Sequence, residues 1–561
     1  MQNRPNYQDL HTRGKSQGHT HMIRVLHALS IGDTLGLASA RASRTLGLPI
    51  TEPQSYKEAR RSPEWPRWQK AMEVEIASHI ENGTWVLTKL PNGRKIITGR
   101  WVFKIKYGLD GSILKYKARW VVHGYKQIAG IDFTSTCAGV VKPASFRALF
   151  ALAGARSLYI YQMDVVTAFL YGFLDEAIYV SQPDGFMTDP TLVCELRKAL
   201  YGLRQSPRVW YGVIQEFLKS LGFTPTAADP SVFVSEDKST YVCVCVDDIL
   251  LIGSEEAYLQ SLRDRLKKRF KMSDLGPISH YLGMLITRTN GRITLNQSAY
   301  LKAILNRFRM SDCKTSPTPM DSGFANVAMP SDDAYTADTD TIYWYASVIG
   351  SLMYAMTMTR PDLGYALSVL SRYCSNPDST HIRAATRVLR YVKGTLHYGI
   401  HYEGKESLIG YTDADFAGAI DGRRSTGGYI YFLSGGPISW SSKRRDLVTQ
   451  STCEAEYVAA AEAGKEAVWL RSLLIQLHAA PRISVPLYGD NQGAIALASN
   501  PEHHRRTKHI DVRYHWIREA VDSGLITLDY VPTADMPADG LTKALVPVKF
   551  ERFLGMIGML H

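Results

Sequence analysis

The sequence predicts a multi-domain α+β protein, and three observations lead to this fold class. The chain has 561 residues, which is too long for a single domain because domains average roughly 150 residues. Strand pairs joined by turn residues alternate with helical patterns before residue 340. After Gly404 the pattern becomes strand-rich and then alternates helix and strand to the end. We therefore expect at least two folded parts, the second an α/β module.

The composition restricts the function classes. The chain is 45% hydrophobic and 21% charged, which excludes a mostly disordered or collagen-like protein. Its net charge is +12, from 65 Lys and Arg against 53 Asp and Glu, and this favours a polyanionic partner. Seven cysteines without a CxxC pair argue against a zinc site and a disulfide framework. The sequence contains no run of 18 apolar residues, so we expect no membrane span.

The elements before residue 260 are expected from local patterns. Residues 1–50 are basic and polar, and we expect a poorly ordered linker there. Gly108-Leu109-Asp110-Gly111 supplies turn residues between two alternating runs, which predicts a β-hairpin. The elements expected are, in order, a helix over 55–76, a hairpin of 100–106 and 114–122, a helix over 145–156, a strand over 159–163, and a hairpin of 231–234 and 241–246.

The second half contains a segment with linker composition. Residues 315–340 are rich in Pro, Ser, Thr, Asp and Ala, and we interpret them as a linker. The triplet Asp321-Ser322-Gly323 matches the aspartic-protease string, but no apolar strands flank it, so protease chemistry is not expected. Helical patterns follow over 342–375 and 381–393, then the α/β module over 405–545 and a tail over 546–561.

Three acidic residues in the first half are candidates for a metal site. Asp164 ends an apolar strand, and Asp247 and Asp248 interrupt the most apolar stretch of the chain. Adjacent acids inside an apolar run cost several kcal/mol of desolvation unless they are paired or bind metal. One interpretation is a charged turn at an exposed hairpin tip. The other is a two-metal site for phosphoryl transfer, and the acids alone do not decide between them.

The sequences around these acids closely resemble copia-type retrotransposon reverse transcriptases. The matching strings are QMDVVTAFLYG at 162–172, IYVSQPDGF at 178–186, LYGLRQSPRVW at 200–210 and VDDIL at 246–250. The resemblance extends from about residue 56 to about residue 545. It implies a right-hand polymerase with fingers, palm and thumb over 51–314, a linker over 315–340, a connection over 341–404 and a ribonuclease H-like domain over 405–545.

The resemblance also assigns roles to residues of the polymerase part. Asp164, Asp247 and Asp248 would hold the metal ions. Phe169 would lie under the incoming sugar and exclude a 2′-hydroxyl, although it could equally be a core aromatic residue. The nucleotide contacts implied are Lys106, Lys117 and Arg119 for the triphosphate, unless they form a solvated basic strand face, and Gln205 beside the nucleotide. Cys245 stands where the family usually has tyrosine, and we expect Cys245→Tyr to keep or improve activity.

A second set of acids lies in the α/β module: Asp413, Glu454, Asp490 and Asp539. Each has a simpler interpretation, because Ser451 and Glu454 fit a helix capping box and the aspartates favour helix amino termini. Together they match the acids of a ribonuclease H site, and the strings GYTDADFAG at 410–418, EAEY at 454–457, DNQGA at 490–494 and ADGLTK at 538–543 resemble the copia-type domain. The basic histidine cluster at 503–509 is expected to contact phosphate or solvent.

The resemblance implies an RNA- and DNA-templated DNA polymerase with ribonuclease H activity from a retrotransposon Pol polyprotein. The expected cofactors are two Mg²⁺ (or Mn²⁺) ions per site, and the expected partners are an RNA template, a DNA primer, an RNA–DNA hybrid and dNTPs, with no membrane. The family's location would be the cytoplasm, in virus-like particles, with access to the nucleus. The alternative is a catalytically dead remnant that only binds nucleic acid.

Overall fold

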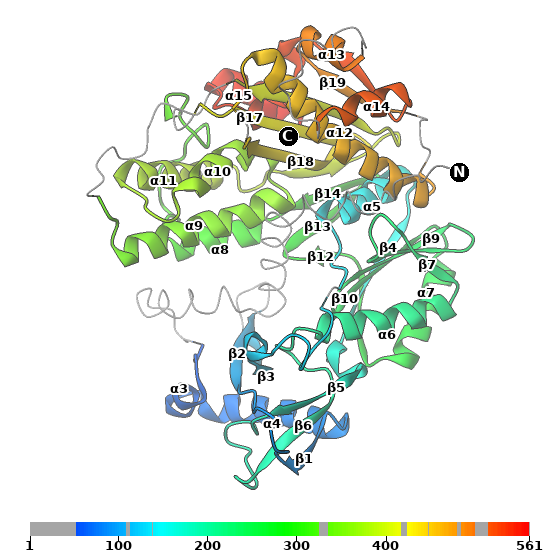
Figure 1. Ribbon diagram of the computed structural model, residues 1–561, viewed down its shortest axis with the longest axis vertical. Coiled ribbons are helices and arrows are strands. Elements are labelled where there is room, and N and C mark those ends of the chain that lie inside the picture. Colours follow the sequence, from blue (N-terminus) through cyan, green and yellow to red (C-terminus); the bar gives the residue numbers. More distant parts are fainter. Residues whose placement is uncertain are drawn as a thin grey trace.

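The computed structural model describes residues 52–107, 113–136, 138–324, 335–416, 423–446, 448–479, 484–499 and 514–559. It is a mixed α+β structure with several sheets, as the sequence predicts. Figure 1 shows the amino-terminal strands at one end of the long axis and the carboxy-terminal sheet at the other, with a six-stranded sheet between them. The predicted linker over 1–50 and the histidine cluster over 503–509 lie outside the described residues. Within the described residues, no helix combines the length and hydrophobicity that a membrane span requires.

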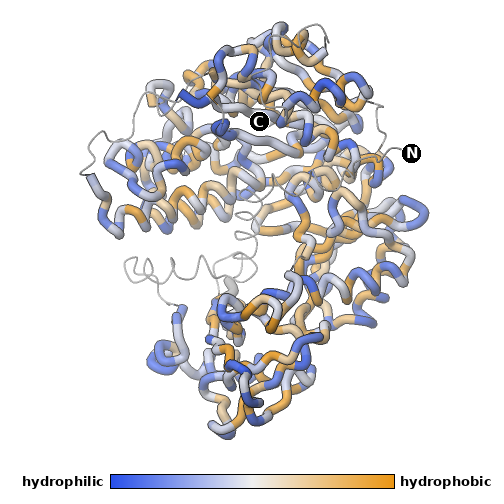
Figure 2. Tube along the Cα trace, viewed as in Figure 1, coloured by the Kyte–Doolittle hydropathy of each residue, from blue (hydrophilic) through white to orange (hydrophobic). Residues whose placement is uncertain are grey.

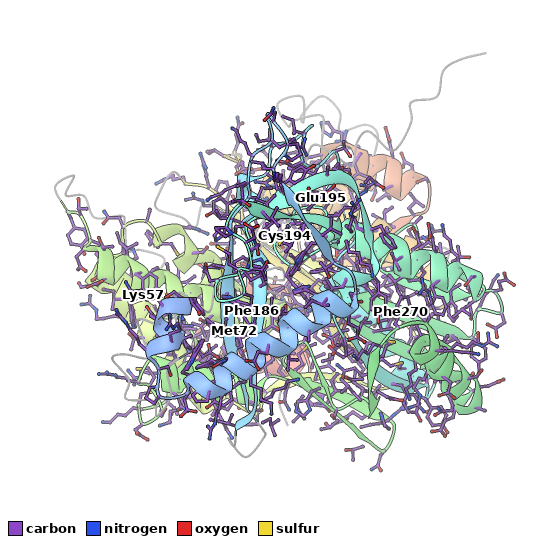
Figure 3. The ribbon with its side chains drawn as sticks, turned by 90° about the horizontal axis from the view of Figure 1, so that it is seen from below. Lys57, Met72, Phe186, Cys194, Glu195 and Phe270 are labelled. Atoms are coloured by element: carbon purple, nitrogen blue, oxygen red, sulfur yellow. The ribbon has the colours of Figure 1, made fainter. Side chains whose placement is uncertain are left out.

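The amino-terminal region confirms the predicted hairpin, because strands β2 (Gly99–Tyr107) and β3 (Ile113–Val122) pair in antiparallel fashion. Three tryptophans, Trp68, Trp101 and Trp120, are fully buried in the core beside it. Met72 and Phe186, labelled in Figure 3, belong to the same core. The remaining elements are α3 (Tyr56–Arg61), α4 (Trp65–Glu81) and the sheet β1-β6-β5, formed by β1 (Trp85–Lys89), β5 (Phe173–Val180) and β6 (Leu192–Lys198).

The central sheet has the strand order β11-β4-β10-β9-β8-β7. Its strands are β4 (Tyr159–Val165), β7 (Phe223–Pro225), β8 (Val232–Ser235), β9 (Thr240–Cys245), β10 (Asp248–Gly253) and β11 (Met272–Pro277). The helices around it are α5 (Pro143–Ala155), α6 (Ser206–Ser220) and α7 (Glu256–Arg269). The second predicted hairpin is confirmed as β8 and β9.

Both faces of this sheet are covered, which explains why its middle strands are apolar without alternation. Leu250 and Ile252 of β10 face the core that contains α5, whereas Ile249 and Leu251 face the core that contains Trp210 of α6. Figure 2 shows these strands as largely hydrophobic. An apolar run of this kind predicts a strand buried on both sides, and the structure confirms it.

The third part joins a small sheet to four helices. The sheet order is β12-β13-β14-β15, with β12 (His280–Tyr281), β13 (Met284–Thr289), β14 (Arg292–Asn296) and β15 (Gly399–Tyr402). The helices are α8 (Ser298–Arg307), α9 (Thr339–Met358), α10 (Gly364–Leu370) and α11 (Ser379–Gly394). Strand β15 pairs with β14 although about 100 residues separate them. The predicted thumb and connection therefore share one sheet.

The described part of the predicted linker, residues 315–324, is packed against the protein. Ser316 and Thr318 are buried and their hydroxyl groups donate to the carbonyls of Thr318 and Met320. Arg387 of α11 also donates to the Thr318 hydroxyl, at 2.9 Å. These hydrogen bonds hold an irregular segment in place, so this part of the expected linker is ordered structure. Residues 325–334 lie outside the described residues.

The carboxy-terminal sheet has the order β18-β17-β16-β19-β20. Strands β16 (Ile409–Asp415), β17 (Thr426–Leu433) and β18 (Gly436–Arg444) are antiparallel, while β19 (Val485–Gly489) and β20 (Ile526–Tyr530) run parallel to β16. The helices are α12 (Thr452–Gln476), α13 (Gln492–Ser499), α14 (Trp516–Asp522) and α15 (Pro547–Met556). Short 3-10 helices are η2 (Gly124–Lys126), η3 (Ala168–Tyr171), η5 (Pro361–Leu363), η6 (Ser371–Tyr373), η9 (Thr533–Asp535) and η10 (Asp539–Leu541).

The segment expected as a tail is instead the packed helix α15. Its residues Phe550, Phe553 and Leu554 are buried, and the Phe550 ring lies 5.6 Å from that of Tyr391 in α11. The apolar residues of this segment recur at helical spacing and bury one face of the helix. The helix thus joins the end of the chain to the α8–α11 helices.

One arginine ties the central sheet to the carboxy-terminal sheet. Arg147 of α5 is buried and donates to the carbonyl of Ile438 in β18 at 2.8 Å and to that of Thr357 in α9 at 2.6 Å. Its guanidinium also lies 3.8 Å from the ring centre of Trp440. Residues of α5 and α12 belong to the same hydrophobic core. The α/β module is therefore packed directly against the central sheet.

Candidate active sites

The central sheet brings the three predicted acids to one edge. Asp248 is the first residue of β10 and stands opposite Asp164 of β4 in the antiparallel register. Asp247 precedes it in the β9–β10 turn, and its carbonyl accepts a hydrogen bond from the amide of Val165 at 2.9 Å. The carboxylate of Asp248 accepts from the amide group of Gln162 at 3.1 Å. Two strands that are 84 residues apart in sequence therefore present their acids side by side.

The turn that carries the aspartate pair is strained. Val246 has a φ of 59°, a left-handed conformation that β-branched residues rarely adopt. The indole of Trp210 donates to the Val246 carbonyl at 2.6 Å and so fixes this turn from α6. Thr167, three residues after Asp164, has a φ of 55°. Strained backbone of this kind persists only where the surroundings enforce it, and it concentrates at functional sites.

The ring of Tyr201 lies between two of the predicted nucleotide contacts, Phe169 and Arg119. The ring of Phe169 lies edge-on against Tyr201, with ring centres 4.7 Å apart, and Phe169 is only 3% exposed. The guanidinium of Arg119 lies over the ring of Tyr201, 4.2 Å from the ring centre. Burial raises the pKa of Tyr201, and Asp247 and Asp164 are among the charges that act on it. Tyr201, which the sequence argument did not single out, therefore links Phe169, Arg119 and the acids.

The other predicted nucleotide contacts are placed differently. Lys117 stands opposite Lys104 across the hairpin, and Lys104 forms an ion pair with Glu52 at 2.7 Å. The side chain of Lys106 lies outside the described residues. Gln205 is 1% exposed; it accepts from Gln127 at 3.0 Å and donates to the carbonyl of Asp132 at 2.8 Å. In this arrangement the Gln205 amide supports its loop, and a nucleotide contact stays a prediction.

The carboxy-terminal acids form a tighter group. One oxygen from each of Asp413, Asp490 and Asp539 lies within 4.8 Å of the others, and across the described ranges this is the one set that gathers three possible metal ligands so closely. Asp413 lies in β16, Asp490 directly follows β19, and Asp539 begins η10. Parallel strands β16 and β19 place their carboxyl ends at the same edge. The structure thus brings together three of the four acids expected in this module, and their role as metal ligands stays a prediction.

Burial dominates the electrostatics of this group. Asp413 is 3% exposed, and burial, with the neighbouring Asp539 and Asp490, raises its pKa to about 7 against the opposing effect of Lys543. The hydroxyl of Thr542 donates to the Asp413 carboxylate. The pKa of Asp539 is also raised by burial. Carboxylates this close and this buried repel one another, so the arrangement favours a bound cation.

Glu454 is not one of the grouped residues, and the structure gives it a capping role. Its amide donates to the hydroxyl of the N-cap residue Ser451 at 3.2 Å, and its carboxylate accepts from the amide of Gln450, the residue before the N-cap, at 2.7 Å. Glu456, two residues later, interacts instead with the group: burial, Asp413 and Asp490 raise its pKa to about 9. The sequence does not single out Glu456, whose charge interacts with this group, and which of the two glutamates binds metal stays a prediction.

Comparison with known proteins matches the region that contains Asp164, Asp247 and Asp248. The family model for reverse transcriptase (RNA-dependent DNA polymerase) matches residues 82–322. The chain is 42% identical over 518 residues to the retrovirus-related Pol polyprotein from transposon TNT 1-94 of Nicotiana tabacum, covering 91% of this chain and 39% of that protein. It is 38% identical to the polyprotein from transposon RE1 of Arabidopsis thaliana, covering 95% of this chain and 36% of the relative.

A shorter relative is matched almost completely. The putative transposon Ty5-1 protein of Saccharomyces cerevisiae is 33% identical over 308 residues, which are 54% of this chain and 98% of that protein. By contrast, the chain spans well under half the length of the plant polyproteins that it matches.

Proposed function

Because the chain belongs to the copia-type retrotransposon Pol family and carries its reverse transcriptase domain, we propose that it copies RNA and DNA templates into DNA and cleaves the RNA strand of an RNA–DNA hybrid. The observation that carries the polymerase proposal is the register pairing of Asp164 with Asp248 beside Asp247. Primer extension on an RNA template with dNTPs tests it.

The palm acids suit a divalent metal ion, because carboxylate oxygens are the ligands that Mg²⁺ and Mn²⁺ prefer. Asp164, Asp247 and Asp248 would hold two such ions. Bound there, the ions would activate the primer 3′-hydroxyl and stabilise the departing pyrophosphate. The chain's own contribution is rigidity: Trp210 holds the carbonyl of Val246, and Gln162 orients the Asp248 carboxylate.

Nucleotide selection is proposed for the cluster formed by Phe169, Tyr201 and Arg119. Arg119, with Lys106 and Lys117 from the same hairpin, would contact the triphosphate, and Gln205 would support the loop beside the base. The Phe169 ring would exclude a ribose 2′-hydroxyl. Its burial against Tyr201 supports this, because a ring held on one side can act as a fixed wall for the sugar.

Ribonuclease H activity is proposed for the carboxy-terminal group. Asp413, Asp490 and Asp539 would hold two metal ions, with Glu456 in the position first assigned to Glu454. The mixed five-stranded sheet and the gathering of acids at one edge support this assignment. The activity fits a second step on the same substrate, since the hybrid made by the polymerase is what such a site cleaves.

The remaining candidate function is nucleic-acid binding by a catalytically dead remnant. The net charge of +12 would support binding without chemistry. The presence of every acid that the two sites require favours the enzyme instead. For location we propose the cytoplasm, within virus-like particles, and the nucleus, as the family relationship implies.

A further inference from the structure

Lys543 lies inside the carboxy-terminal acidic group. Its ammonium nitrogen is 2.7 Å from a carboxylate oxygen of Asp539, four residues earlier. Asp413 and Asp415 also act on it electrostatically, and it acts in turn on Glu456. The side chain is 38% exposed, so it reaches the group from its solvent side. Lys543 therefore acts on four carboxyl groups, those of Asp539, Asp413, Asp415 and Glu456, which come from three different elements.

Thr542, the residue before Lys543, contacts the same acidic group. Thr542 donates its hydroxyl to Asp413, while Lys543 pairs with Asp539. Asp490 is engaged separately, because its carboxylate accepts from Thr533 at 2.7 Å. Residues 542 and 543 thus contact two of the three aspartates that lie within 4.8 Å of one another.

The charge of Lys543 offsets repulsion among the carboxylates around it. Neighbouring carboxylates repel each other strongly when they are partly withdrawn from water. An ammonium ion among them offsets that repulsion, as a metal ion would. A divalent cation that binds Asp539 then competes with Lys543 for the negative charge of that carboxylate.

We propose that Lys543 is a built-in counterion of the carboxy-terminal site, which a divalent metal ion displaces from Asp539. This inference rests on the proposed ribonuclease H function, since it concerns the metal affinity of that site. Lys543 stabilises the acidic group when no metal is bound and weakens metal binding through competition. The site would then require a higher metal concentration than its carboxylates alone would need.

The test compares Mn²⁺ binding, measured by electron paramagnetic resonance of the free ion, in full-length chains that all carry Asp247→Asn and Asp248→Asn. These two changes remove two of the three proposed palm ligands and so weaken metal binding there. In this background, Lys543→Met is expected to bind Mn²⁺ about tenfold more tightly, because the competing charge is gone. Lys543→Arg keeps the charge and is expected to stay near the parent protein.

Lys549→Met is the matched control, because Lys549 is exposed, carries the same charge and acts on Asp539 less strongly than Lys543 does. Its Mn²⁺ affinity is expected to change less than about twofold. A second readout is the melting temperature in chelator, which should be lower for Lys543→Met than for the parent. Addition of Mn²⁺ should then raise the melting temperature of Lys543→Met by more than that of the parent. If Lys543→Met does not fold, Lys543→Gln is compared in the same way.

Unchanged or weaker Mn²⁺ binding in Lys543→Met would overturn the counterion role and show that Lys543 only positions Asp539. Asp490→Asn in the same background separates this from failure of the proposed function. If Asp490→Asn leaves Mn²⁺ binding of the parent intact, the acidic group is not a metal site, and both proposals fall. If Asp490→Asn removes binding while Lys543→Met has no effect, only the counterion inference fails.

Discussion

Asp248 stands directly opposite Asp164 across the antiparallel strands β10 and β4. This pairing places two carboxylates at the end of one sheet, where the strained turn at Val246 adds a third from Asp247. The acids are thus fixed by backbone register and not by flexible side chains alone. A register shift of one residue would turn Asp248 to the other face of the sheet, so the site depends on the pairing of the two apolar strands.

Phe169→Val is expected to admit ribonucleotides. The substitution removes the ring that packs edge-on against Tyr201, which opens space beside the sugar. The preference for dNTP over rNTP, measured as a ratio of kcat/KM, should fall by at least about tenfold. Tyr201→Phe keeps the ring and serves as the control, with a nearly unchanged ratio. An unaltered ratio in Phe169→Val, with a lowered Tm, would assign Phe169 to the core only.

Cys245→Tyr should destabilise the protein, although the family pattern predicts that this change keeps or improves activity. Cys245 is buried in the core that contains Tyr281, next to the buried thiol of Cys243. Adding a ring there overpacks the core and should cost about 1–3 kcal/mol. Urea unfolding measures this cost, with Cys245→Ala as a control that adds no volume. A tyrosine variant as stable and active as the parent would contradict the prediction.

Glu456→Gln should reduce cleavage of RNA in a hybrid by about a hundredfold or more, because the carboxylate that faces Asp413 and Asp490 loses its charge. Glu454→Gln should retain cleavage within about threefold, since glutamine can replace glutamate at this capping position. Release of labelled RNA fragments measures both variants, and primer extension on the same preparations should be unaffected. The reverse order of the two effects would return Glu454 to the metal site.

The stability of the metal-free protein should fall as pH rises from about 5 to 9. Burial raises the pKa of Asp413 from 3.8 to about 7 and that of Glu456 from 4.5 to about 9. The folded protein therefore keeps protons that the unfolded chain releases, and this stabilisation is lost as pH rises through the raised values. Tm in chelator at several pH values should decline less steeply in Glu456→Gln. Equal slopes for both proteins would show that Glu456 ionises normally.

The hairpins and buried strands are predictable because the residues within each element determine them. Turn residues mark both hairpins, and the apolar runs of β9 and β10 reflect burial on two faces. The pairing of β14 with β15 was not predictable, since it joins segments about 100 residues apart across four helices. The segment 315–324 has linker composition, but Ser316 and Thr318 satisfy its backbone by hydrogen bonds that composition does not reveal.

The choice between Glu454 and Glu456 shows where sequence reasoning fails at the site. Residues two positions apart on a helix point about 200° apart, so only one of them faces Asp413. Helix α12 is buried on most sides in its first half, and its apolar pattern therefore does not identify the face. In the sequence, the capping signature at Ser451 argues against a metal role for Glu454, and only the match to the ribonuclease H acids favours one.

The measurement that tests the central claim most directly is primer extension on an RNA template, with Mg²⁺ and with Mn²⁺, by the parent chain and by Asp248→Asn. We predict extension by the parent and by Asp264→Asn, a control at an exposed acid of α7. Asp248→Asn should show no extension while it binds the primer–template with nearly the same affinity, because phosphate contacts dominate binding. Extension by Asp248→Asn at the parent rate would contradict the assignment of the polymerase site.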